Sequence, residues 1–360
     1  MNFVIAAGGT GGHLFPGIAV GEVLIGRGHK VMLLISEKEI DAVATKGCSD
    51  FRIEKVAGEG LQSKSPFALL RFWLKLQVAK KRCEQLYAEW NPSAVLGMGG
   101  FTCFAPIFIG RKRKVPTFVH ESNAIPGRAN KLNARYVTRV LLGFEECRHH
   151  FPKAVCEVVG TPIRSALKQP VNKSDARASF GLSREKTTLL VMGGSQGAAG
   201  INRRVVAALP ALGGRVQAIH LTGKSDEAST REAYAAANVK AYVAAFHHSM
   251  QDAYGAADIA IARSGAASLT ELSHFSLPSI LIPYPFAADD HQTANARIFE
   301  KAGAGLMMRE SDATGQAVAA NLTGILDSPS RLSEMSRNAH SLAPENSAEL
   351  VADTILESCA

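Results

Sequence analysis

The chain has 360 residues, of which 46% are hydrophobic and 20% are charged. This length exceeds one ordinary domain and predicts two domains of about 150–200 residues, and the apolar content excludes an intrinsically disordered protein. The formal net charge of +8 is uneven, because residues 1–160 hold 22 Lys and Arg against 13 Asp and Glu, whereas residues 161–360 hold 18 against 19. The first domain is therefore expected to carry a basic face.

The six cysteines form no CxxC pair and no metal-ligand spacing, which favours a reducing cytoplasm and predicts no metal site. The opening residues reach glycine too early for a signal peptide, and no apolar run approaches the roughly 20 residues of a membrane span. These features predict an intracellular globular chain.

Short β-branched runs alternate with helical segments along the chain. The strands of the first half are expected at 3–7, 30–36, 51–56, 94–96, 116–120, 137–142 and 155–159. Those of the second half are expected at 188–192, 217–222, 241–243, 259–262, 279–283 and 305–308. The longest helix is predicted from about Pro66 to Trp90. Apolar strands alternating with helices indicate parallel sheets buried on both faces.

The two halves begin alike, each with an apolar strand, a Gly-Gly-(Thr/Ser)-x-Gly turn and a helix. This repetition predicts an α/β fold of two Rossmann-like, doubly wound domains that face a cleft. The first domain is expected at 1–163 and the second at 164–342. A terminal helix within 343–360 is expected to pack back on the first domain.

Glycine-rich turns after strands allow a phosphate to approach the backbone at a helix N-terminus, although glycine also serves tight packing. Such turns occur at 8–12, 97–100 and 193–198. The dinucleotide fingerprint fails at Leu14, but Glu37 keeps an NAD site open as an alternative. The sequence has no P-loop and no Asp-x-Asp pair for a metal-held sugar nucleotide. A diphosphate would therefore be stabilised by helix ends and arginine.

Two polar clusters follow strands in the second half. The segment 263–271 opens a helix, and Glu271 lies where a carboxylate can accept two ribose hydroxyls, or where it merely favours the helix dipole. In the segment 283–295, Asp289 or Asp290 can cap the next helix, while Gln292 and Asn295 share a helical face.

The first half has its own polar cluster at 120–123, although turn chemistry alone would explain Ser122 and Asn123. His13 follows the first glycine turn and is a candidate general base, with a structural hydrogen bond as the alternative.

The segment 64–82 contains six Lys and Arg, no acid, and many large apolar residues. A core helix with a basic edge is one interpretation. The adjacent apolar residues Phe72 and Trp73 favour instead a surface that contacts anionic lipid. Nucleic acid is the competing partner, but no nucleic-acid motif accompanies the charge.

Several motifs together resemble one family. They are GGTGGHxxPGxA at 8–19, GMGGF at 97–101, HExN at 120–123, VGTPIR at 159–164, GGSQGA at 193–198, RSGAxSLxE at 263–271 and DHQxxNA at 290–296. In order and spacing they resemble the MurG family of glycosyltransferase family 28, the UDP-N-acetylglucosamine:undecaprenyl-pyrophosphoryl-MurNAc-pentapeptide N-acetylglucosaminyltransferases. The resemblance implies a GT-B fold without a cofactor or metal, and a peripheral location on the cytoplasmic face of the bacterial inner membrane. It also implies transfer of GlcNAc from UDP-GlcNAc to the C4 hydroxyl of MurNAc in lipid I, with inversion, giving lipid II for peptidoglycan synthesis, cell shape and division.

The resemblance also assigns roles to residues, with His13 and Glu271 as catalytic candidates. The implied donor contacts are Thr10, Gly11, Gly12, Asn123, Arg164, Ser195, His247, Ala266, Ala267, Ser268, Leu269, Thr270, Glu271 and Gln292. Gly99, Gly100, His120 and Glu121 are implied on the acceptor and diphosphate side. The implied membrane contacts are Phe72, Trp73, Lys75, Lys80 and Lys81. The implied partners are the donor, lipid I, an anionic membrane surface and a wall-synthesis or division complex, without nucleic acid.

Three alternatives remain open from the sequence. A different GT-B enzyme with a diacylglycerol or secondary-metabolite acceptor would share the donor half. A Rossmann oxidoreductase would bind NAD at the first glycine turn. A membrane adaptor without catalysis would leave Glu271 and Gln292 without a role. The chain also departs from the family pattern at Phe101, Ser122 and the pair 247–248.

Overall fold

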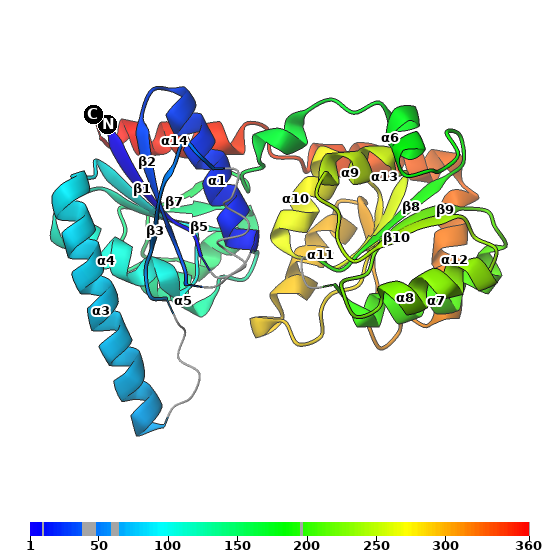
Figure 1. Ribbon diagram of the computed structural model, residues 1–360, viewed down its shortest axis with the longest axis horizontal. Helices are drawn as coiled ribbons and strands as arrows, with labels where there is room; N and C mark the ends of the chain where they lie inside the picture. The colour runs from blue at the N-terminus through cyan, green and yellow to red at the C-terminus, as the bar shows by residue number, and fades with distance from the viewer. Residues whose placement is uncertain (9–10, 38–47, 59–64, 195–196, 360) are drawn as a thin grey trace. The chain divides into compact units, whose positions relative to one another are not determined.

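The computed structural model describes residues 1–8, 11–37, 48–58, 65–194 and 197–359. The chain divides into unit 1, residues 1–165 and 344–360, and unit 2, residues 166–343. Each unit is built on one parallel β-sheet, seven-stranded in unit 1 and six-stranded in unit 2 among the described residues (Figure 1). The prediction of two doubly wound α/β domains is confirmed.

The sheet of unit 1 has the order β3-β2-β1-β4-β5-β6-β7. Its strands are β1 (Asn2–Ala6), β2 (Lys30–Ile35), β3 (Arg52–Lys55), β4 (Ala94–Gly97), β5 (Thr117–Glu121), β6 (Arg139–Leu142) and β7 (Cys156–Val158). Its helices are α1 (Gly11–Gly26), α3 (Pro66–Trp90), η1 (Phe101–Cys103), α4 (Phe104–Lys112), α5 (Arg128–Asn133), η2 (Glu145–His150) and α14 (Ser347–Glu357).

The sheet of unit 2 has the order β10-β9-β8-β11-β12-β13. Its strands are β8 (Thr188–Met192), β9 (Gln217–Leu221), β10 (Ala241–Ala244), β11 (Ile259–Ala262), β12 (Ser279–Leu281) and β13 (Gly305–Met307). The helices that follow the linker turn η3 (Ser165–Lys168) are α6 (Lys173–Ser179), α7 (Ala199–Leu212), α8 (Glu227–Ala236), α9 (Met250–Ala256), α10 (Ala266–His274), η4 (Ala288–Asp290), α11 (His291–Lys301), α12 (Gly315–Leu326) and α13 (Pro329–Ser341).

Alternating residues of β1 divide the core of unit 1 into two layers. Phe3 and Ile5 face one layer, which includes Val351 and Ile355 of the terminal helix α14. Val4 faces the other layer, which side chains of α3 and α4 fill. Because successive strand residues point to opposite faces, both faces of this sheet need a helical cover. The helix at the end of the chain thus belongs to the core of the first unit.

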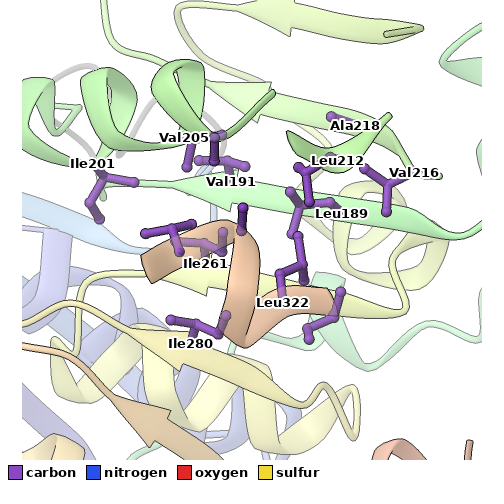
Figure 2. Packing of buried hydrophobic residues seen from close by; sticks show 14 of the residues in the cluster. Leu189, Val191, Ile201, Val205, Leu212, Val216, Ala218, Ile261, Ile280 and Leu322 are labelled. Carbon is purple, nitrogen blue, oxygen red and sulfur yellow. The ribbon is translucent and has the colours of Figure 1, made fainter. Parts of the chain in front are cut away.

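One face of the unit 2 sheet is covered by α7 and α12. Figure 2 shows Val191 of β8 and Ile261 of β11 packed with Val205 and Leu322 of these helices. All four side chains have no solvent exposure. Burying a side chain of this size contributes about 1.5–3 kcal/mol. This layer holds the strand ends of unit 2 in a fixed arrangement.

At three border strands, a side chain pairs with one outward-facing backbone group. Arg148 donates to the carbonyl oxygen of Cys156 in β7 at 2.8 Å, and Arg231 donates to that of Val243 in β10 at 2.8 Å. At β13, the carboxylate of Glu300 accepts the N–H of Met307 at 3.1 Å. Each contact satisfies a backbone group that an edge strand leaves unpaired.

Candidate active site

In both sheets the strand order reverses beside the first strand, between β1 and β4 in unit 1 and between β8 and β11 in unit 2. Ligands of open α/β sheets bind outside the carboxyl ends of the strands at such a switch point. The glycine turns at 8–12 and 97–100 follow β1 and β4, and the turn at 193–198 follows β8. The sequence therefore places all three glycine turns at the two switch points.

The turn after β4 requires glycine, because Gly99 and Gly100 have φ angles of +114° and +76°. The ring of His13 lies against this turn, and a β-carbon at Gly99 would stand 2.8 Å from His13 Nε2. Of the first glycine turn, Gly11 and Gly12 begin helix α1, whereas Thr10 lies outside the described residues. The structure thus brings together His13, Gly99 and Gly100 from two sequence motifs.

His120 at the end of β5 is fully buried. Its Nε2 lies 2.8 Å from the carbonyl oxygen of Gly160, which can only accept, so Nε2 carries the proton. The hydroxyl of Ser122 lies 3.2 Å from Nδ1 and donates to it. Burial lowers the pKa of His120, consistent with a neutral ring. His120 therefore supports the loop and has no ring nitrogen left for substrate.

The carboxylate of Glu121 organises the following loop. Its Oε1 accepts the backbone and side-chain N–H groups of Asn123 at 2.9 and 3.1 Å. Its Oε2 accepts the N–H of Gly127 at 3.0 Å and the side-chain amide of Asn130 at 2.9 Å. Four donors on one buried carboxylate fix its position strongly. Asn123 is thereby held in a fixed orientation at the carboxyl end of β5.

Arg164 belongs to unit 1 and sits beside α1. Its guanidinium carbon lies 3.9 Å from the centre of the Phe15 ring, a close cation–π contact. Its Nε is buried and has no hydrogen-bond partner among the described residues. The backbone N–H of the next residue, Ser165, donates to Glu22 of α1 at 3.1 Å. The expected phosphate-binding arginine thus rests on the first unit, whereas Ser195 of unit 2 lies outside the described residues.

Helix α10 begins directly after β11, at the switch point of unit 2. Gly265 precedes it in an extended conformation, and no side chain caps the helix. The first N–H groups of a helix carry a partial positive charge and favour an anion. The expected donor-binding stretch forms the first turns of this helix; its members are Ala266, Ala267, Ser268, Leu269, Thr270 and Glu271.

Two hydrogen bonds tie Ser264, in the segment that leads into α10, to α11. The hydroxyl of Ser264 donates to the carbonyl oxygen of Gln292 at 2.8 Å, and the amide of Asn295 donates to the carbonyl oxygen of Ser264 at 3.1 Å. The side-chain oxygen of Gln292 accepts the N–H of Tyr284 at 2.9 Å. Because the amide oxygen of Gln292 is engaged in this way, its amide nitrogen is the group oriented for donation.

The side chain of Glu271 lies on the second turn of α10. It accepts a hydrogen bond from the hydroxyl of Tyr254 of α9, at 2.5 Å from Oε2. His247 follows β10 and contacts Phe180 and Tyr242, with ring centroids at 4.9 and 5.7 Å. Burial lowers the pKa of His247. These positions place Glu271 and His247 at the carboxyl ends of two different strands.

Sequence reasoning missed two supporting residues. Arg263 is buried, donates to the carbonyl oxygens of Ile282 and Pro283 at 3.0 Å each, and pairs with Glu310 at 2.6 Å. Its place in the RSGAxSLxE motif was a signal for such a role. Tyr254 had no local signal, because its partner Glu271 comes from another element. Arg263 fixes the loop after β12, and Tyr254 fixes the side chain of Glu271 on α10.

Helix α3 places the expected membrane contacts on different faces. Trp73 is 54% exposed, whereas the Phe72 ring packs edge-to-face on Phe101, with centroids 6.0 Å apart. Lys80 lies over the Phe108 ring at 4.1 Å, Lys75 is half-buried and Lys81 is exposed. Four apolar side chains at helical spacing are also exposed, and we call them the α3 stripe: Phe67, Leu70, Leu74 and Val78.

Two broader features of the described residues bear on the site. No helix among them is long and apolar enough to cross a membrane. No group of three or more His, Cys, Asp or Glu side chains within the described ranges is arranged to hold a metal ion.

Comparison with known families matches both halves of the chain. Residues 3–142 match the glycosyltransferase family 28 N-terminal domain, and residues 188–354 match the family 28 C-terminal domain. A relative from Geotalea uraniireducens is 36% identical over 358 residues, covering 98% of this chain and 97% of its own. One from Myxococcus xanthus is 37% identical over 364 residues, covering 99% and 93%. Both are named UDP-N-acetylglucosamine–N-acetylmuramyl-(pentapeptide) pyrophosphoryl-undecaprenol N-acetylglucosamine transferase.

Solved structures agree with this assignment. The crystal structure of MurG from Acinetobacter baumannii matches with a TM-score of 0.78 at 26% identity, covering 99% of each chain. The kitacinnamycin glycosyltransferase matches with a TM-score of 0.71 at 14% identity, over 100% of this chain and 99% of its own, which shows the fold alone. On the evidence of both halves, the chain belongs to glycosyltransferase family 28 and, within it, to the MurG family of N-acetylglucosamine transferases.

Proposed function

We propose that this protein transfers GlcNAc from UDP-GlcNAc to the C4 hydroxyl of MurNAc in lipid I, with inversion, and so makes lipid II. The observation that carries the proposal is the end-to-end identity of 33–37% with relatives named for this transfer. The geometry of the two switch points supports the same chemistry, because each offers backbone donors where a phosphate can approach.

Unit 2 is proposed to bind the donor. The uncapped N-terminus of α10 supports a role in stabilising the diphosphate of UDP, on which negative charge grows as the sugar departs. One well-placed donor of this kind contributes about 3–4 kcal/mol to transition-state stabilisation. Ser195 and Arg164 are proposed as further diphosphate contacts. The proposal assigns the ribose hydroxyls to Glu271, the GlcNAc hydroxyls to Gln292 and Asn123, and the uracil to the backbone of His247.

Unit 1 is proposed to bind the acceptor, with His13 as the base that removes the proton of the attacking C4 hydroxyl. The ring of His13 lies at the glycine turns of the switch point, whereas both nitrogens of His120 are engaged within the protein. The carboxylate of Glu121 is likewise surrounded by four donors of its own loop. The contacts of His120 and Glu121 are all made within the protein. They favour a scaffolding role for His120 and Glu121 beside Gly99 and Gly100.

We further infer that unit 1 contacts the cytoplasmic face of an anionic membrane through α3. The α3 stripe recurs at positions i, i+3, i+7 and i+11, which lie on one face of a helix. Arg71 and Lys81 border this face, and both are exposed. In Figure 1 the Pro66 end of α3 extends beyond the sheet of its own unit. An exposed apolar face bordered by cations is the usual design of a peripheral membrane contact.

The proposed reaction is tested by incubating the purified protein with radiolabelled UDP-GlcNAc, a lipid I analogue and EDTA. Labelled disaccharide lipid would establish the donor, the acceptor and independence from divalent metal together. Binding of UDP-GlcNAc without transfer would overturn the acceptor assignment while leaving the donor assignment in place. The absence of both binding and transfer would overturn the proposed function.

A further inference from the structure

Tyr254 and Glu271 form a short hydrogen bond between α9 and α10. The phenol oxygen lies 2.5 Å from Glu271 Oε2, at the short end of the range for a hydroxyl that donates to a carboxylate. Met192 Sδ lies 3.5 Å from the same phenol oxygen, but a thioether is a much weaker acceptor. The single phenol proton therefore belongs to the bond with Glu271.

The ring of Tyr254 is held rigidly in unit 2. It is 2% exposed and stacks on Phe275 at the end of α10, with ring centroids 5.1 Å apart and planes at 21°. The contact with Met192 joins the ring to the last residue of β8, directly before the third glycine turn. A rigid donor fixes one oxygen of a carboxylate and, with it, the plane in which the second oxygen lies.

A carboxylate that binds two ribose hydroxyls must present its oxygens in one orientation, because a misplaced acceptor loses most of a hydrogen bond. Glutamate has three rotatable side-chain torsions, and ordering such a side chain costs entropy. An internal hydrogen bond meets that cost before the donor arrives and thus raises affinity. Tyr254 supplies this bond from outside the α10 helix.

We propose that Tyr254 is a positioning residue for donor recognition, which acts by orienting Glu271 toward the ribose of UDP-GlcNAc. The inference rests on the proposed function, in which Glu271 binds the ribose hydroxyls. Tyr254 itself does not touch the donor. Its effect is exerted on donor affinity, while the chemical step at the sugar is left unchanged.

The test is Tyr254→Phe, which keeps the buried ring and its stacking on Phe275. The KM for UDP-GlcNAc is expected to rise about tenfold, because hydrogen bonds to charged groups are among the strong ones, while kcat changes less than about twofold. The matched control is Tyr234→Phe, which removes a phenol that is also 2% exposed in unit 2 but lies 3.2 Å from His220 Nδ1. The control is expected to leave the KM for UDP-GlcNAc unchanged.

A donor analogue that lacks the ribose 2′-hydroxyl separates positioning from a general loss of stability. The ratio of kcat/KM for UDP-GlcNAc to that for the 2′-deoxy analogue is expected to fall in Tyr254→Phe, because the ribose contact is already weakened. This ratio is measured on one preparation, so a partly unfolded sample does not change it. An unchanged ratio in Tyr254→Phe would overturn the proposal.

Glu271→Gln and the double variant Glu271→Ala/Tyr254→Phe separate the ribose contact of Glu271 from the positioning role of Tyr254. If Tyr254 acts through Glu271, adding Tyr254→Phe to Glu271→Ala, which leaves no acceptor for the phenol, causes little further loss. A fully additive double variant would show that Tyr254 acts elsewhere. If Glu271→Gln keeps both the KM and the 2′-hydroxyl ratio, the ribose assignment of Glu271 fails. If Glu271→Gln is impaired and Tyr254→Phe is not, only the positioning role fails.

Discussion

The imidazole of His13 lies so close to Gly99 that a β-carbon at this glycine would stand 2.8 Å from His13 Nε2. Gly99 also has a φ angle of +114°, which side chains other than hydrogen rarely allow. The turn after β4 therefore serves as the wall against which the His13 ring rests. Two sequence motifs that are about 90 residues apart meet in this contact, and the proposed base depends on both.

Replacement of His13 by alanine tests the proposed base directly. We expect kcat to fall by about 10²–10⁴-fold, because that is the usual contribution of a positioned general base. The KM for UDP-GlcNAc should stay within about twofold, since the ring is not proposed to bind the donor. Steady-state kinetics with both substrates measures the two constants. His149→Ala, an exposed histidine of the same unit, is the control, and near-normal turnover in His13→Ala would remove the residue from the role.

Gly99→Ala should impair the same step without touching the imidazole chemistry. The new methyl group would displace the His13 ring and strain the backbone by about 1–3 kcal/mol. We expect a lower kcat together with a lower melting temperature. Gly26→Ala is the matched control, because a β-carbon there meets no atom within 4 Å and Gly26 has no positive φ. Equal turnover in the two variants would show that the turn does not position His13.

Glu121→Gln should loosen the loop that holds Asn123. An amide presents only one acceptor oxygen, so one pair of the four N–H donors on Glu121 would lose its partner. We expect unit 1 to lose about 3 kcal/mol of unfolding free energy and the KM for UDP-GlcNAc to rise, because Asn123 is proposed to bind the GlcNAc hydroxyls. Chemical denaturation and kinetics measure these effects. Glu84→Gln breaks only the exposed pair with Lys112 and should change neither quantity; an equal loss in both variants would contradict the special role of Glu121.

The buried His220 predicts a loss of stability in acid. Burial lowers its pKa to about 3, and its ring nitrogens lie 3.0 Å from Asn202 Oδ1 and 3.2 Å from the Tyr234 hydroxyl. Between pH 3 and the unfolded pKa of about 6.5, His220 is protonated in the unfolded chain but neutral in the folded one. The contribution of His220 to the free energy of unfolding is therefore fully present above pH 6.5 and is lost as the pH falls below it. The expected slope is about 1.4 kcal/mol per pH unit.

Denaturation of unit 2 at pH 7 and pH 5 measures this slope. His220→Gln removes the titrating group, so its unfolding free energy should change less between the two pH values than that of the unchanged chain. The exposed His248 gives the control substitution, His248→Gln, which should keep the full slope. A slope that survives in His220→Gln would assign the acid sensitivity to other groups.

The α3 stripe predicts a specific pattern of membrane binding. The double variant Leu70→Glu/Leu74→Glu should abolish flotation with phosphatidylglycerol vesicles, because it places two charges on the apolar face. The control is Val155→Glu, which changes an apolar residue that is 63% exposed and directly precedes β7, outside α3. Lys81→Glu should weaken binding to anionic vesicles by about 1 kcal/mol and leave binding to neutral vesicles unchanged. Flotation of the double variant at the level of the unchanged chain would refute the contact.

The fold was predictable because its signals are local. The helix Pro66–Trp90 has the predicted bounds: Ser65 caps its first turn, proline occupies the first position, and Asn91 ends it with a left-handed conformation. Strands β8 and β11 also have the predicted bounds, since each is a short apolar run between polar or glycine residues. The terminal helix begins at Ser347, a few residues later than expected.

The contacts inside the site were less predictable because they join distant segments. Nothing near Tyr254 in the sequence indicates Glu271, and nothing near His120 indicates the carbonyl of Gly160. For α3, Phe72 packs on Phe101, whereas its neighbours Trp73 and Leu74 are both exposed, so adjacency in sequence did not reveal which of the three side chains is covered. The roles that the family resemblance assigns to individual residues remain predictions for the experiments above.

The side chains that cover β7, β10 and β13 have a consequence for behaviour at high concentration. Arg148, Arg231 and Glu300 occupy the backbone groups to which a strand of another molecule would pair. Intermolecular sheet growth is therefore blocked at these three borders. Self-association in the absence of lipid should proceed through the α3 stripe, as a detergent-sensitive aggregate, rather than by strand addition at β7, β10 or β13. The same charges that abolish vesicle binding should then also keep the protein in solution.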